Sequence, residues 1–132
     1  MPKIEQPAAH PAIVQARLTE NVERLKDYYT KLFGKPGWDD GGFYGWQLGS
    51  GWITIGAHDQ VKGKNPDPGR VIWNIVTPDV KGEFEKLKAA GATVVRGPYN
   101  PGGPEQSGGQ EMLIATFSDP DNNYFQLMSP MA

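Results

Sequence analysis

The sequence predicts an α+β fold built from two tandem β-α-β-β-β modules that form a curved mixed sheet around a cleft. First, a strand-like segment leads directly into an amphipathic helical pattern in each half, at residues 13–18 and again at 71–77. Second, each helical pattern stops at a glycine, Gly34 or Gly91, after a similar length. Third, short β-prone segments follow each helix. The halves share few identical residues, so the repeat is one of pattern.

In the first half, the expected helix covers residues 21–33, with Thr19 or Asn21 as the capping residue. Gly49-Ser50-Gly51 is a plausible hairpin turn between two of the strands that follow. The expected strands are residues 13–18, 43–48 and 52–57, with a very short additional strand near Trp38.

In the second half, Pro78-Asp79 opens the expected helix at residues 79–90. Residues 97–110 show no structural period and are predicted to be a long loop, either a lid over the cleft or simply mobile. Tyr99 falls in this loop. The expected strands are residues 71–77, 93–96, 111–117 and 124–128.

The last two strands enclose a turn with the sequence SDPDNN. Pro120 favours the second turn position, and the aspartates beside it can accept hydrogen bonds from backbone amides. In the final strand, Phe125 and Leu127 alternate with polar and amphipathic neighbours, so this pair should face the core. Tyr124, Gln126 and Met128 should then point away from it.

The composition limits the functions to consider. The chain has 132 residues, a net charge of -2 and no cysteine, so we expect no nucleic-acid partner, no anionic membrane surface, no disulfide and no thiolate chemistry. The N-terminal segment lacks the apolar core of a signal peptide, and a cytoplasmic protein is expected. We interpret residues 1–132 as one domain, with modules at 12–58 and 71–130 and a linker at 59–70.

Each sheet should bury one face under its helix, which leaves the opposite faces to line a shared cleft for a small ligand. The sides of Trp38, Trp46 and Trp73 stay open, with core and subunit interface as the plainer alternatives. For Arg17, a solvated position and an anion-binding role are both open. The candidate ligand-binding residues are Gln15, Arg17, Trp52, Thr54, Asn74, Tyr99, Tyr124, Gln126 and Met128, with Ile72 as a further cleft-facing position.

Three motifs give the chain a resemblance to a known family. Residues 117–127 read FSDPDNNYFQL, residues 21–34 read NVERLKDYYTKLFG, and residues 77–95 read TPDVKGEFEKLKAAGATVV. In this order they resemble the vicinal oxygen chelate superfamily, which includes glyoxalase I, bleomycin-resistance proteins and extradiol dioxygenases, over residues 11–130. The resemblance implies the paired-module fold, which hosts many activities.

Metal-dependent members of this superfamily hold a divalent ion with His and Glu side chains from four strands. Overlaying the motifs puts these positions at Thr54, Ile72, Gln126 and, on the first strand, Ile13 or Gln15. None is His, Asp or Glu, and the only histidines, His10 and His58, lie elsewhere. The resemblance therefore implies that the usual metal site is missing, and we expect no metal and no cofactor.

Two functions remain. The first is a metal-free binding protein like the bleomycin-resistance branch, a homodimer that sequesters an aromatic or antibiotic-like small molecule and so confers antibiotic resistance. The alternative is an enzyme of the superfamily, a lyase, isomerase or dioxygenase. It would need an unanticipated divalent metal site, or acid–base chemistry by Glu105, Glu111 or a tyrosine.

Overall fold

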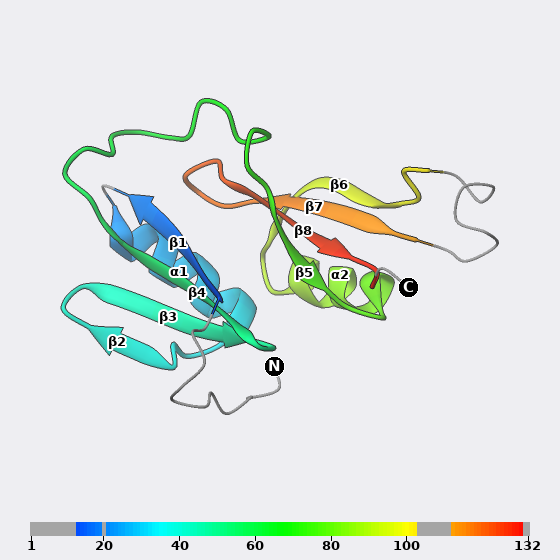
Figure 1. Ribbon diagram of the computed structural model, residues 1–132, viewed down its shortest axis with the longest axis horizontal. Coiled ribbons are helices and arrows are strands. Elements are labelled where there is room, and N and C mark those ends of the chain that lie inside the picture. The colour runs from blue at the N-terminus through cyan, green and yellow to red at the C-terminus, as the bar shows by residue number, and fades with distance from the viewer. Residues whose placement is uncertain (1–12, 20, 103–111, 131–132) are drawn as a thin grey trace. The chain divides into compact units, whose positions relative to one another are not determined.

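The computed structural model describes residues 13–19, 21–102 and 112–130, with the backbone alone for 13–19. The chain divides into two compact units, Met1–Lys64 and Asn65–Ala132 (Figure 1). The elements of the first unit are β1 (Ile13–Thr19), α1 (Val22–Phe33), β2 (Trp38–Asp40), β3 (Phe43–Leu48) and β4 (Gly51–Ala57). Those of the second unit are β5 (Trp73–Val76), α2 (Val80–Ala89), β6 (Thr93–Tyr99), β7 (Ile114–Ser118) and β8 (Tyr124–Met128).

The two units share one topology. Within the described residues, the sheets have the orders β1-β4-β3-β2 and β5-β8-β7-β6. In each, the first strand pairs with the last in parallel, and the remaining pairs are antiparallel. The predicted α+β fold of two β-α-β-β-β modules is confirmed, including the very short strand near Trp38.

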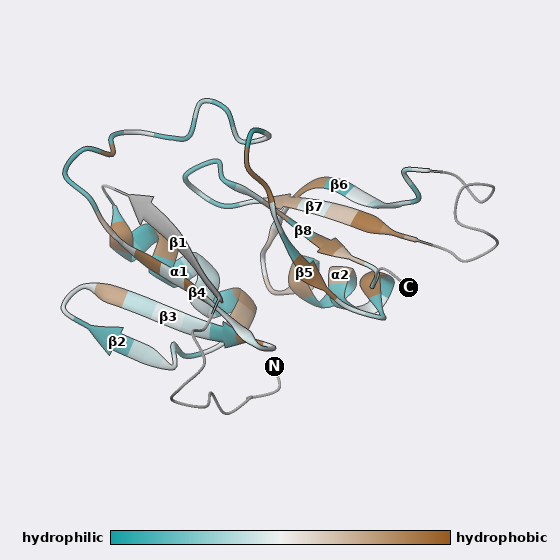
Figure 2. Cartoon of the chain, in the orientation of Figure 1, coloured by the Kyte–Doolittle hydropathy of each residue, from teal (hydrophilic) through white to brown (hydrophobic). Residues whose placement is uncertain are grey.

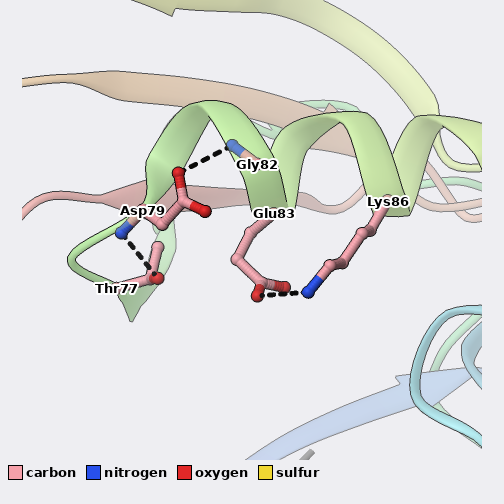
Figure 3. A network of polar contacts seen from close by, with 5 residues as sticks. All are labelled: Thr77, Asp79, Gly82, Glu83 and Lys86. Atoms are coloured by element: carbon pink, nitrogen blue, oxygen red, sulfur yellow. Dashed lines mark hydrogen bonds and ion pairs between the residues drawn. The ribbon is translucent and has the colours of Figure 1, made fainter.

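Both helices begin at residues whose side chains accept a backbone hydrogen bond. Asn21 accepts from Arg24 N (3.2 Å) at the start of α1. Asp79 accepts from Gly82 N (3.0 Å) at the start of α2, and its own N–H donates to Thr77 Oγ1 (Figure 3). Such caps satisfy amides that the first helical turn leaves unpaired. The predicted starts of both helices are therefore correct to one residue.

Aromatic side chains fill the core of each unit, between the helix and one face of the sheet. In the first unit, Tyr29 lies between Phe33 and Trp46, and Trp46 Nε1 donates to the carbonyl oxygen of Gly34 at 2.7 Å. In the second unit, Trp73 stacks on Phe125 with ring centroids 5.3 Å apart. Trp46 and Trp73 are thus core residues, which resolves the question that the sequence left open for them.

The turn between β7 and β8 holds part of the connection that precedes β5. Asp119 Oδ1 accepts from the amides of Asp121 and Asn123, both at 2.9 Å. Asn65 N donates to Asp121 O, Asn65 Nδ2 to Asn123 Oδ1, and Asn122 Nδ2 to Asn65 O. Asn65 therefore belongs to the second unit. The connection around it is mostly hydrophilic (Figure 2).

Several strand ends differ from the prediction. Strand β6 continues to Tyr99, so the expected loop at 97–110 begins later and Tyr99 is a strand residue. Gly97 and Pro98 are tolerated because β6 is an edge strand with two register shifts, where a missing N–H costs little. Strand β5 begins at Trp73 rather than at residue 71, and β7 ends at Ser118. Residues 103–111, which include Glu105 and Glu111, lie outside the described residues.

Candidate functional site

The first open face is the side of the β1-β4-β3-β2 sheet opposite α1. In β4, Ile53 and Ile55 are only 1% exposed, on the side of the sheet that α1 packs against. Alternation places the other residues of the strand on the opposite side. Through the strand pairing, this face comprises Trp38, Asp40, Phe43, Gly45, Gln47, Trp52, Thr54 and Gly56.

Glycines let aromatic rings lie directly against the backbone of this sheet. A Cβ atom at Gly45 would lie 3.2 Å from Trp38 Cε3 and 3.3 Å from Trp52 Cε3, so both rings border this position. The ring of Phe43 occupies the space where a side chain at Gly56 would be. Trp38 remains 44% exposed and Phe43 41% exposed. The first open face thus presents partly exposed aromatic rings. They lie against the sheet backbone at Gly45 and Gly56, where no side chain intervenes.

The second open face is the side of the β5-β8-β7-β6 sheet opposite α2. The burial of Phe125 and Leu127, both at most 1% exposed, confirms the predicted alternation of β8. A polar row then crosses all four strands in register, formed by Asn74, Gln126, Thr116 and Arg96. A mainly apolar row runs beside it, formed by Val76, Met128, Ile114 and Tyr99.

Two contacts organise the polar row. Gln126 Nε2 donates to Thr116 Oγ1 at 3.0 Å, and this threonine is buried. At the other end, the guanidinium carbon of Arg96 lies 3.4 Å from the centre of the Tyr99 ring. Residues three apart in a regular strand point to opposite faces. The register shifts on either side of Arg96 therefore account for the contact with Tyr99.

The predicted ligand-binding residues fall on both faces. Trp52 and Thr54 lie on the first, and the second holds Asn74, Tyr99, Tyr124, Gln126 and Met128. In β1, Gln15 pairs in register with Ile53 and Arg17 with Ile55, and this row of β4 is the buried one. The side chains of Gln15 and Arg17 lie outside the described part of the chain. Ligand binding by any of these residues, and a cleft shared by both sheets, remain predictions.

Four aromatic or polar residues on which the description of the two faces depends were not among the predicted ligand-binding residues. Trp38 was considered without a side, and Phe43, Arg96 and Thr116 were not candidates. Phe43 and Trp38 could have been found from the period-2 alternation that relates them to Trp52. Arg96 could not, because its place beside Tyr99 depends on two register shifts that have no plain sequence signal.

At the three family metal positions whose side chains are described, the residues do not fit a divalent ion. Thr54 offers a hydroxyl, Gln126 one neutral amide oxygen, and Ile72 no donor atom in its side chain. Among the described residues, no group of three or more His, Cys, Asp or Glu side chains could hold a metal. His58 Nδ1 instead accepts from Gln60 N at 3.1 Å, which is a local turn contact.

Comparison with known proteins identifies the family. A family model described as a glyoxalase-like domain matches residues 12–128. The chain belongs to this glyoxalase-like family. With it, the chain is part of the vicinal oxygen chelate superfamily that the motifs indicated. No helix in the described part of this glyoxalase-like chain is long and apolar enough to cross a membrane.

The individual relatives share little sequence identity with this chain. The glyoxalase-like chain is 29% identical over 82 residues to an uncharacterized protein of Mycolicibacterium smegmatis, covering 62% of this chain and 68% of the relative. A glyoxalase/bleomycin resistance protein from Catenulispora acidiphila has a similar structure, with a TM-score of 0.69, 12% identity, and coverage of 91% and 98% of the two chains. A fosfomycin resistance protein from Mesorhizobium loti gives 0.64 and 16%, with coverage of 95% of each. These two structural similarities show a shared fold alone.

Proposed function

We propose that the protein binds a flat, partly aromatic small molecule without a metal ion and sequesters it rather than transforming it. The observation that carries this proposal is the seating of Trp38 and Trp52 at Gly45, with Trp38 partly exposed. Rings held against a glycine backbone are already ordered, so a stacked ligand loses little additional side-chain entropy on binding. Each aromatic contact adds about 0.5–1.5 kcal/mol beyond the area it buries.

The chemistry of the family positions supports the metal-free part of the proposal. Threonine, isoleucine and glutamine stand at positions where the metal-dependent members of the family have the imidazole and carboxylate ligands that suit divalent transition metals. Two structural neighbours carry the words bleomycin resistance or fosfomycin resistance in their names. An antibiotic-like ligand is therefore a reasonable first class of compound to test.

Tryptophan fluorescence tests the proposal directly. Trp46 and Trp73 are buried and should give a constant background, whereas Trp38 and Trp52 should respond to a ligand on the first open face. We expect at least one compound in a panel of flat aromatic natural products to quench or shift the emission. Trp52→Ala should weaken binding by about tenfold, because a good aromatic contact contributes up to about 1.5 kcal/mol. Gln126→Ala should have a smaller effect.

Two glycine variants provide a matched pair. Gly45→Ala would push its new methyl group against both tryptophan rings, which must then move by a few tenths of an ångström. Gly37→Ala also faces Trp52, but its Cβ would lie at an ordinary contact distance of 3.4 Å from Cη2. Binding should therefore weaken in the first variant and persist in the second. If no compound changes the fluorescence, or if Trp52→Ala binds as well as the parent, the proposal is wrong.

A second copy of the chain is the alternative occupant of the same face. The exposure of Trp38 and Phe43 favours it as well, since large exposed apolar side chains often mark protein interfaces. We propose a homodimer, as the family resemblance implied. Sedimentation equilibrium of the parent and of Trp38→Asp shows whether this face joins two subunits: dissociation caused by the substitution assigns the face to the dimer.

A further inference from the structure

We propose that the second open face recognises a small aromatic carboxylate, with Arg96 binding the carboxylate and the apolar row binding the rings. The proposal concerns residues of the second unit alone, and its test does not depend on the function proposed for the first open face. Among the described residues in register on this face, Arg96 is the one cation and none is acidic. The surface is therefore complementary to an anion.

The position of Arg96 suits it to a planar anion. Its guanidinium stacks on Tyr99, with 3.4 Å between the guanidinium carbon and the ring centre. Stacking uses the flat face of the guanidinium, whereas its N–H donors lie in the plane and can still bind the two oxygens of a carboxylate. The ring thus limits the motion of the side chain and makes Arg96 a better-ordered donor than an ordinary exposed arginine.

The residues next to Arg96 define the rest of the ligand. Ile114 and Met128 follow Tyr99 along the apolar row, and Met128 can adapt to the shape of a ring system. Adjacent strands are about 4.8 Å apart, so about 10 Å separates β6 from β8. A carboxylate at Arg96 with two fused rings over Ile114 and Met128 spans this distance. A neutral ligand of the same size would make the same apolar contacts but would not form the ion pair with Arg96.

The test compares 2-naphthoate with 2-naphthamide, which have the same rings but differ in charge. Each is titrated into the full chain at low salt while amide chemical shifts are followed by NMR, which reports both affinity and location. We expect 2-naphthoate to shift amides of β6, β7 and β8 and to bind about three- to tenfold more tightly than the amide. This range lies between an exposed ion pair and a charge-assisted hydrogen bond. Added salt should reduce the difference.

Variants assign the difference to Arg96. Arg96→Gln should abolish the preference for naphthoate, whereas Arg70→Gln, which removes the same charge from the connection, should preserve it. Tyr99→Phe should keep the preference, because the ring remains, and Tyr99→Leu should reduce it. A preference that survives Arg96→Gln, equal binding of the two compounds, or no binding of either would overturn the inference. None of these results depends on Trp52, so Trp52→Ala tests the first open face separately.

Discussion

At the scale of single residues, the fold alters the proton equilibrium of Tyr44. Tyr44 belongs to β3 and is buried, and its hydroxyl donates to Glu23 Oε1 of α1 at 3.2 Å. Burial raises the pKa of Tyr44 above its usual value of 10.0, and the hydrogen bond and charge of Glu23 raise it further. Lys26, whose ammonium lies 4.8 Å from the ring centre, acts in the opposite direction.

This shift predicts a loss of stability in alkaline solution. Because the pKa of Tyr44 is higher in the folded state, its contribution is fully present below the unfolded pKa of about 10. It is lost as pH rises through the folded pKa. Urea unfolding at a series of pH values should show this decline, and Tyr44→Phe should remove part of it. Glu23→Gln should remove a smaller part, since burial is the first cause. An identical pH profile in Tyr44→Phe would contradict the assignment.

At the scale of elements, two residues have opposite effects on the stability of the start of α2. Asp79 stabilises it as the cap, whereas Gly82 has a low helix propensity but leaves room for that cap. Asp79 caps the helix through Gly82 N, and a Cβ atom at Gly82 would collide with the capping carboxylate (Figure 3). Asp79→Ala should lower the free energy of unfolding by about 0.5–2 kcal/mol, as measured by urea denaturation. Gly82→Ala alone should have almost no net effect, because the helix propensity it gains, about 1 kcal/mol, offsets the displaced cap.

The double variant separates these two effects. Once Asp79 has been replaced by alanine, no carboxylate remains to collide with residue 82, so Gly82→Ala should stabilise the protein by about 0.8–1 kcal/mol. If Gly82→Ala has the same effect with and without Asp79, the collision has no energetic consequence and the interpretation is wrong.

The elements also show what the sequence could and could not predict. Both helices and β8 were predictable because their signals are local: a capping side chain, an apolar stripe at helical spacing, a terminal glycine and strict alternation. The end of β6 was not, because Gly97 and Pro98 resemble loop residues and only an edge position accommodates them in a strand. Tyr99 was therefore assigned to the loop and proposed as a ligand residue there. Arg96 was overlooked because its place beside Tyr99 depends on two register shifts.

At the scale of the whole molecule, the residues at the family's metal positions predict that divalent metal ions do not stabilise the protein. A ligand that binds only the folded state raises the melting temperature, and the increase grows with the ratio of its free concentration to its Kd. Because Thr54, Ile72 and Gln126 replace the family's ligands, adding Ni²⁺, Mn²⁺, Fe²⁺ or Zn²⁺ should leave the melting temperature of the protein unchanged. Stoichiometric metal in protein purified without chelators, or an increase of several degrees, would disprove the metal-free proposal.

The hydrogen bonds at Asn65 determine the length of the flexible segment that connects the two units. The sequence suggests a tether of residues 59–70, but the β7–β8 turn fixes Asn65, so only residues 59–64 join the units. Halving a flexible loop lowers its closure entropy cost by about 0.6 kcal/mol. This corresponds to roughly a threefold higher effective concentration of each unit around the other. A turn that looks like a local hairpin feature thus shortens the segment of chain that connects the two units.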